Sequence, residues 1–256
     1  GSVSITAGET RSSNAWGGDV SIIGGLGSSA DATNGGNGGM VFVAGGDSFG
    51  EGGKETGGEV MLTGGKAANG FGGDVNVMSG RSGAGSSGDV FVGTANSGTA
   101  GVSGGITVRS GDTTDGGSGD ITVQTGAGTQ GNGGDINVAV GVGNKGDGGN
   151  IAVTAGETTD AKTTGGEISI TAGLGSSKAG DGGSGGAIRI TGGESQGGDE
   201  VANTGGDIFI DGGRAESSFG GDINVKSGYS ASTSSGNINI SSHIAGAKGN
   251  SGDLSM

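Results

Sequence analysis

The chain has 256 residues, of which 71 are glycine. It contains no proline or cysteine and has a formal net charge of −14. The excess of 26 Asp and Glu over 12 Lys and Arg argues against a nucleic-acid binder, which needs a basic surface toward phosphates. The lack of cysteine excludes disulfides and thiolate metal sites, and no apolar run is long enough to predict a membrane span. Glycine-rich, acidic chains are usually disordered unless a strict repeat organises them.

Such a repeat occurs along the whole chain, and residues 72–80, with the sequence GGDVNVMSG, represent it. We number each copy from its first aliphatic residue, position 0, and find sixteen copies, mostly fifteen residues apart. Repeats of this size are typical of solenoids and propellers. In chain order, position 0 is Val3, Val20, Val41, Val60, Val75, Val90, Ile106, Ile121, Ile136, Ile151, Ile168, Ile188, Ile208, Ile223, Ile238 and Leu254.

Other positions of the repeat are equally regular. Position −2 is glycine in every copy, position +2 is apolar, position +4 is almost always small, with Val140 the largest, and position +5 is glycine except at Ala95 and His243. Because strand side chains alternate between two faces, positions 0 and +2 share one face and position +1 faces outward. The small residue at +4 indicates a tapering core. Glycines on both sides of a short strand predict positive φ or close backbone approach at corners.

The equivalence of the copies predicts an all-β fold, a parallel β-solenoid in which each unit contacts its neighbours. We expect narrow glycine-rich coils of about 15 residues, roughly 16 coils, in one unit over residues 1–256. Val75 and Val77 would then face an inner seam. Longer connections, such as 24–37 and 192–204, should bulge from the rod. Because the pattern shows no cap at either end, we expect continuation end to end, by longer sequence or by head-to-tail stacking.

Acidic residues precede position 0 in most copies. Stacked coils would bring these carboxylates close together, a repulsive arrangement unless cations or backbone donors intervene. Calcium is one hypothesis, since hard cations choose oxygen ligands, and the other is that the carboxylates are solvated or accept hydrogen bonds from glycine amides. The spacing departs from the calcium-binding GGxGxDxUx pattern, because Val75 follows Asp74 directly. The calcium candidates are Asp74, Asp89, Asp120, Asp135, Asp207 and Asp222.

Nothing in the sequence predicts a catalytic or cofactor site. Three stretches match GxGxxG, at 83–88, 126–131 and 141–146, but a dinucleotide site also needs a following helix, and the repeat predicts another strand. His243 is the only histidine, so we interpret it as a variation of a corner glycine. We expect no enzyme activity.

Aromatic residues occur at two repeat positions. Three are at +1, where they face outward, and three are at −4. Outward rings could contact a neighbouring rod or a sugar, and we favour lateral self-association, with packing under a loop as the alternative. These residues are Phe42, Phe91 and Phe209 at +1, and Trp16, Phe71 and Phe219 at −4.

The repeats resemble the glycine-rich repeat proteins found in diatoms and related algae, as residues 94–104, TANSGTAGVSG, and 148–159, GGNIAVTAGETT, illustrate. The resemblance covers essentially the whole chain and implies a cell-surface or extracellular location without implying an active site.

Our first hypothesis is an extracellular structural protein that forms a rod or filament, as a fibre, sheath or adhesin stalk. Its partners would be other copies of itself, end to end and laterally. The alternative is a solenoid that binds a surface, namely ice, polysaccharide or mineral, through one flat face. Thr154, Thr171 and Thr191 would align for ice binding, but Met78, Arg109 and Asp211 interrupt that row in other copies.

Overall fold

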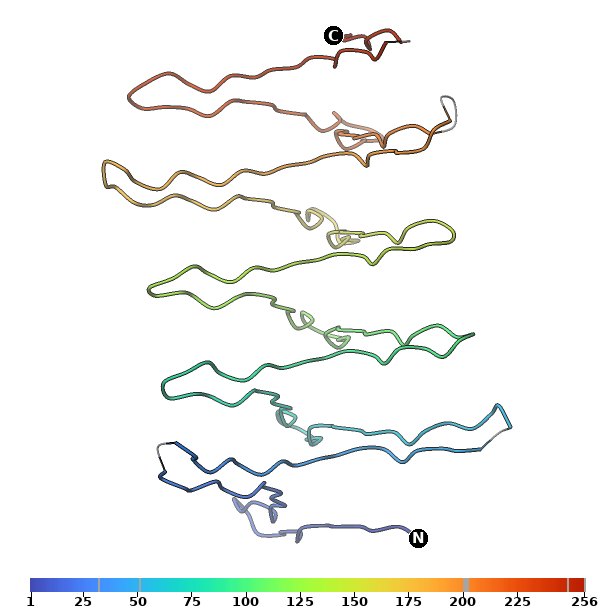
Figure 1. Ribbon diagram of the computed structural model, residues 1–256, viewed down its shortest axis with the longest axis vertical. Helices are drawn as coiled ribbons and strands as arrows, with labels where there is room; N and C mark the ends of the chain where they lie inside the picture. Colours follow the sequence, from blue (N-terminus) through green and yellow to red (C-terminus); the bar gives the residue numbers. More distant parts are fainter. Residues whose placement is uncertain (32, 51, 200–202, 248, 256) are drawn as a thin grey trace. The chain divides into compact units, whose positions relative to one another are not determined.

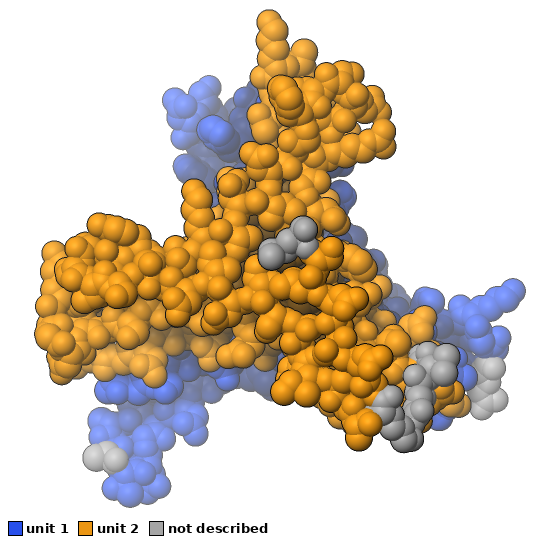
Figure 2. All heavy atoms as spheres, turned by 90° about the horizontal axis from the view of Figure 1, so that it is seen from above, with its two compact units in different colours: residues 1–124 blue, residues 125–256 orange. Residues whose placement is uncertain are grey.

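The computed structural model describes residues 1–31, 33–50, 52–199, 203–247 and 249–255. Within these ranges the chain forms neither a helix nor a hydrogen-bonded strand, and extended segments alternate with narrow loops in which the chain turns back (Figure 1). Contacts divide the chain into two units, Gly1–Gln124 and Thr125–Met256 (Figure 2), and the same repeat builds both. Met256, the last predicted aliphatic residue of the repeat, lies outside the described residues.

One backbone hydrogen bond recurs at the base of the loops. The N–H of the glycine at −2 donates to the carbonyl oxygen of the glycine at +5 of the preceding copy. We call this bond the closure. It joins residues eight to fourteen positions apart and has a donor–acceptor distance of 2.7 to 3.0 Å. The closures are Gly18 to Gly8, Gly39 to Gly25, Gly58 to Gly46, Gly73 to Gly65, Gly88 to Gly80, Gly166 to Gly156, Gly186 to Gly173, Gly206 to Gly193, Gly221 to Gly213 and Gly236 to Gly228.

Closure formation follows the size of the residue at +4. Every described copy with glycine or alanine there has a closure of 2.7 to 2.9 Å. Serine at this position gives two closures of 3.0 Å, after Ser79 and Ser227, and none after Ser110 or Ser242. No closure follows the three larger, branched residues, which are Thr94, Thr125 and Val140.

Close backbone contact at the closure explains this size limit. A Cβ added to Gly64 would overlap the carbonyl oxygen of Gly73, and glycines at +4 in four other copies face the same contact. A larger side chain there must push the two legs of the loop apart. In one such copy the hydroxyl of Thr125 donates to the carbonyl oxygen of Gly134 at 3.2 Å. The small residue at +4 therefore serves loop closure, which the tapering-core interpretation did not include.

The two repeated glycines have different roles. A Cβ on the −2 glycine Gly73 would lie 3.0 Å from the nitrogen of Gly65, which confirms the predicted close approach on that side of the strand. Of the two predicted reasons for glycine, positive φ does not apply at +5, because the described glycines with positive φ are Gly53, Gly116 and Gly146, all within loops. The +5 glycines, moreover, have open space where a Cβ would stand.

The aliphatic side chains of the repeat are exposed in the single chain. No described hydrophobic side chain is buried, and Val75 and Val77 are 53% and 68% exposed. The same chain therefore gives these residues no inner face among its described parts. The stacked β-solenoid stays a prediction, and it requires a surface that covers them. The described residues also contain no helix of the length and apolar character that crossing a membrane requires.

The closure rule predicts the effect of one substitution. Changing Gly64→Thr should break the closure between Gly73 and Gly65, because a branched side chain would crowd the carbonyl of Gly73 and no described copy with threonine at +4 has a closure. Since one hydrogen bond contributes about 1 kcal/mol net, hydrogen exchange of the Gly73 amide should accelerate roughly fivefold. Gly64→Ala is the matched control, because three copies with alanine at +4 keep a closure. Unchanged exchange in Gly64→Thr would contradict the rule.

Candidate functional site

The most extensive feature of the surface is the row of exposed aliphatic side chains at positions 0 and +2, which we call the seam. After the first copy, side chains at position 0 are 47% to 58% exposed, and those described at +2 are 63% to 74% exposed. This uniformity follows from the repeat, since each copy has the same local sequence pattern, and it holds whether or not a closure forms nearby. The seam therefore presents the same exposed pair of apolar side chains once in each copy of the repeat.

The backbone of the seam is also unsatisfied within the chain. No backbone hydrogen bond between described residues involves positions 0 to +3 of any copy. Extended segments with free N–H and C=O groups are ready to pair with another strand. Each copy thus combines two aliphatic side chains on one face with a row of unpaired backbone groups. This combination is suited to β-strand pairing by backbone recognition.

The six aromatic residues predicted for lateral contact are all exposed. They range from 77% for Phe42 to 101% for Phe71, so no loop covers any of them in the described chain, and lateral contact and packing under a loop both stay predictions. The ring of Phe91 lies over Gly93, where an added Cβ would come within 2.7 Å of the ring. Phe49 and Tyr229, which the sequence analysis did not select, are each 89% exposed in loops. The aromatic residues are therefore available for contact with another molecule.

The acidic residues at −1 are exposed and separate. All six calcium candidates lie at the surface, and the described residues contain no group of three or more carboxylate or histidine side chains that could hold a metal ion. The two ion pairs between described residues use other carboxylates, Arg11 with Glu9 at 3.2 Å and Arg109 with Asp112 at 3.8 Å. Calcium binding at the −1 carboxylates stays a prediction that needs ligands from beyond a single copy.

Polar side chains organise several loops by bonding to the local backbone. The carboxylate of Asp31 accepts the N–H groups of Thr33 at 2.8 Å and Asn34 at 3.0 Å. Because these bonds favour the charged form, first from Thr33 and then from Asn34, the pKa of Asp31 lies below its ordinary value. Ser82 accepts the N–H of Gly85 at 2.8 Å in the same manner. Such turns are typical of Asp and Ser, and the sequence analysis did not assign them.

A second acidic loop is built in a similar way. The carboxylate of Glu55 accepts the N–H of Lys54 at 3.0 Å and that of Gly52 at 3.1 Å. Hydrogen bonds from the backbone of Glu55 itself and of Lys54 lower the pKa of this carboxyl. The loop forms an open hollow beside Asp47 and Phe49. The carboxylate of Glu55 is occupied by its hydrogen bonds to the backbone of the loop.

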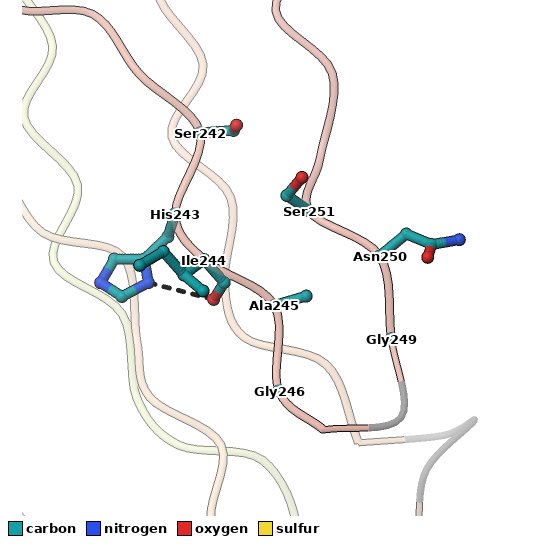
Figure 3. Close-up of a pocket in the computed structure, with 8 residues that line it drawn as sticks. All are labelled: Ser242, His243, Ile244, Ala245, Gly246, Gly249, Asn250 and Ser251. Carbon is teal, nitrogen blue, oxygen red and sulfur yellow. Dashed lines mark hydrogen bonds between the residues drawn. The ribbon is translucent and has the colours of Figure 1, made fainter.

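The hollow around His243 contains no catalytic arrangement among its described residues. It lies between two legs of one loop, and the imidazole projects from the outer side of its leg, away from Asn250 and Ser251 (Figure 3). The Nδ1 atom of His243 lies 3.2 Å from the carbonyl oxygen of the adjacent Ile244. The residues that line the hollow include no carboxylate, so His243 has no acidic partner there to orient it for proton transfer.

The seam is therefore the candidate functional surface of the described chain. Comparison with protein-family models, with curated proteins and with solved structures gives no match. Functional inference must accordingly start from the chain's own residues and their repetition.

The geometry of the Asp31 loop predicts a pH dependence. The stabilising effect of Asp31 should be complete above the ordinary carboxyl pKa and should be lost as the pH falls through its lowered pKa in the folded loop. NMR titration should show the amide signals of Thr33 and Asn34 shifting together with the Asp31 carboxyl. In Asp31→Asn, which keeps a carbonyl acceptor without the titrating group, these amides should lose that pH dependence. Titration of Asp31 at or above its ordinary value would refute the assignment.

Proposed function

We propose that the protein is an extracellular structural protein that forms a rod or filament, by stacking of its repeats and by end-to-end assembly. The observation that carries the proposal is the seam, which repeats in every copy and is exposed throughout the described chain. Exposed apolar surface of this extent marks an interaction surface. A surface that recurs at nearly constant sequence spacing favours a partner with the same repeat, as in an extended assembly.

The repeated organisation of the chain supports a structural role. Repeat proteins with quasi-one-dimensional architecture gain stability by adding equivalent neighbouring contacts, so each added copy extends the same interface. The catalytic and binding features that an enzyme would need, a cluster of titratable groups in an enclosed pocket, are not seen among the described residues. The extracellular location rests on the resemblance to algal glycine-rich repeat proteins.

Electron microscopy of the purified protein tests the proposal. We expect elongated particles or filaments that grow longer as the protein concentration rises. Monodisperse compact particles of about 24 kDa over the whole concentration range would overturn the proposal. Measurements with and without a calcium chelator would show whether cations at the −1 carboxylates contribute to assembly.

One pair of seam residues provides a sharper prediction. Burial of an aliphatic side chain of this kind contributes about 1.5 to 3 kcal/mol, so the double substitution Val75→Asp and Val77→Asp should raise the protein concentration needed for assembly by at least a hundredfold. Light scattering across a dilution series would measure this change.

The matched control is Asn76→Asp, which adds a charge between the same two residues at a position that the strand pattern places on the opposite face. It should change the required concentration by less than tenfold. Equal effects of the control and the double substitution would show that charge, and not loss of the seam, causes the change.

A further inference from the structure

The seam lacks two kinds of partner at once. Its side chains are exposed, and the backbone groups at positions 0 to +3 of each copy have no hydrogen bond to a described backbone group. Where a closure forms, it joins two consecutive copies, and no backbone bond between described residues joins their seam segments. The chain thus fixes the loops with its own hydrogen bonds but leaves the segments between them unpaired.

The +5 glycine is a second, independent observation. It is replaced in two complete copies only, by Ala95 and His243, although glycine costs more conformational entropy than any other residue. The single chain gives no reason for glycine there, since φ is not positive and a Cβ at Gly65, for example, would meet nothing within 4 Å. Glycine in an extended segment marks a place where another backbone approaches closely. Gly73 approaches Gly65 through the closure, but no described atom lies within 4 Å of where a Cβ on Gly65 would stand.

The solvent-accessible surface area of the chain is much larger than that of a compact protein of the same mass. The chain exposes 25078 Å², whereas a compact monomer of 23.7 kDa exposes about 9,800 Å². Stable obligate interfaces bury about 2,000 to 5,000 Å² or more. The excess is far above what a stable dimer needs.

We propose that each seam segment pairs with a seam segment of a second copy of this chain, so that the backbone of that copy passes beside the +5 glycine. The partner must offer an extended backbone and an aliphatic pair every fifteen residues or so, with small residues where the chains cross. Another copy of this chain has that pattern. The inference rests on the proposed function, and it specifies that several chains together form the core of the rod.

Charge imposes one condition on this pairing. Two chains with a net charge of −14 each repel one another, but the −1 carboxylates are exposed and salt screens exposed charges. Association should therefore strengthen as the salt concentration rises from 10 to about 150 mM. A cationic partner protein would show the reverse dependence.

Photo-leucine cross-linking tests the pairing directly. Leu62 is at +2 in the seam, whereas Leu26 and Leu174 are exposed in loops and serve as internal controls. After illumination of the assembled protein, a denaturing gel should show multiples of the 23.7 kDa chain. Mass spectrometry should join Leu62 to seam residues of another chain, with few such links from Leu26 or Leu174.

The outcomes separate the pairing from the proposed filament. Cross-links from Leu62 confined to single-chain bands, with filaments present by electron microscopy, would overturn the pairing and leave the filament standing. Interchain links from Leu62 in small discrete particles would support the pairing and contradict the filament. The absence of seam links of either kind would overturn the pairing.

A substitution at the +5 glycine tests the second observation. Gly65→Val should keep the closure with Gly73, because its Cβ enters open space, but should raise the concentration needed for assembly at least tenfold. Gly83→Val is the control, since Gly83 also has open space around its Cβ but lies in a loop. If both variants assemble like the unaltered chain, no second backbone passes beside Gly65 and the proposal fails.

Discussion

The hydrogen bond between the glycine N–H at −2 and the glycine carbonyl at +5 of the preceding copy is the interaction on which the described structure depends. In the absence of helices, sheets and buried side chains in the described chain, it is the one long-range backbone contact that recurs from copy to copy. It forms only when the two legs of a loop approach closely, and this explains why glycine is found at −2 and why +4 must be small. The closure sets where each loop begins and ends, and thereby which residues are left in the extended segment.

Closure and seam are complementary parts of the same repeat. Where it forms, the closure satisfies one donor and one acceptor, whereas the extended segment of each copy keeps its backbone groups and its aliphatic side chains unpaired in the described chain. A single chain can therefore order its loops with its own hydrogen bonds. Most of its apolar side chains, in contrast, need contact with another surface to be buried. Since hydrophobic burial is the dominant favourable term in folding and association, stability of the whole should depend on assembly more than on any bond within one copy.

Much of the local architecture could be predicted from the sequence, and the tertiary packing could not. The repeat located the loops and the close approach at glycines such as Gly73, because a missing side chain and a fixed spacing are visible in the sequence. It left open whether glycines such as Gly65 serve positive φ or a close approach, since a repeated glycine can reflect either backbone conformation or a neighbouring chain. The same ambiguity applies to Val75 and Val77: alternation shows that they share a face, but does not show what covers that face. The turns at Asp31 and Ser82 use residue types too common in these loops to be singled out.

The closure also allows the length of a loop to vary without changing the rest of the repeat. The loop between Gly65 and Gly73 and the much longer one between Gly25 and Gly39 end in nearly the same bond, 2.8 and 2.7 Å. Because the entropy of closing a loop rises by only about 0.6 kcal/mol for each doubling of its length, residues can be inserted beyond the glycine pair at little energetic expense. Outward-facing chemistry, such as the aromatic and charged side chains at the loop tips, is thereby free to diversify from copy to copy while the interior spacing is kept. Loops of varied sequence and length are thereby added at nearly constant spacing along the repeated sequence.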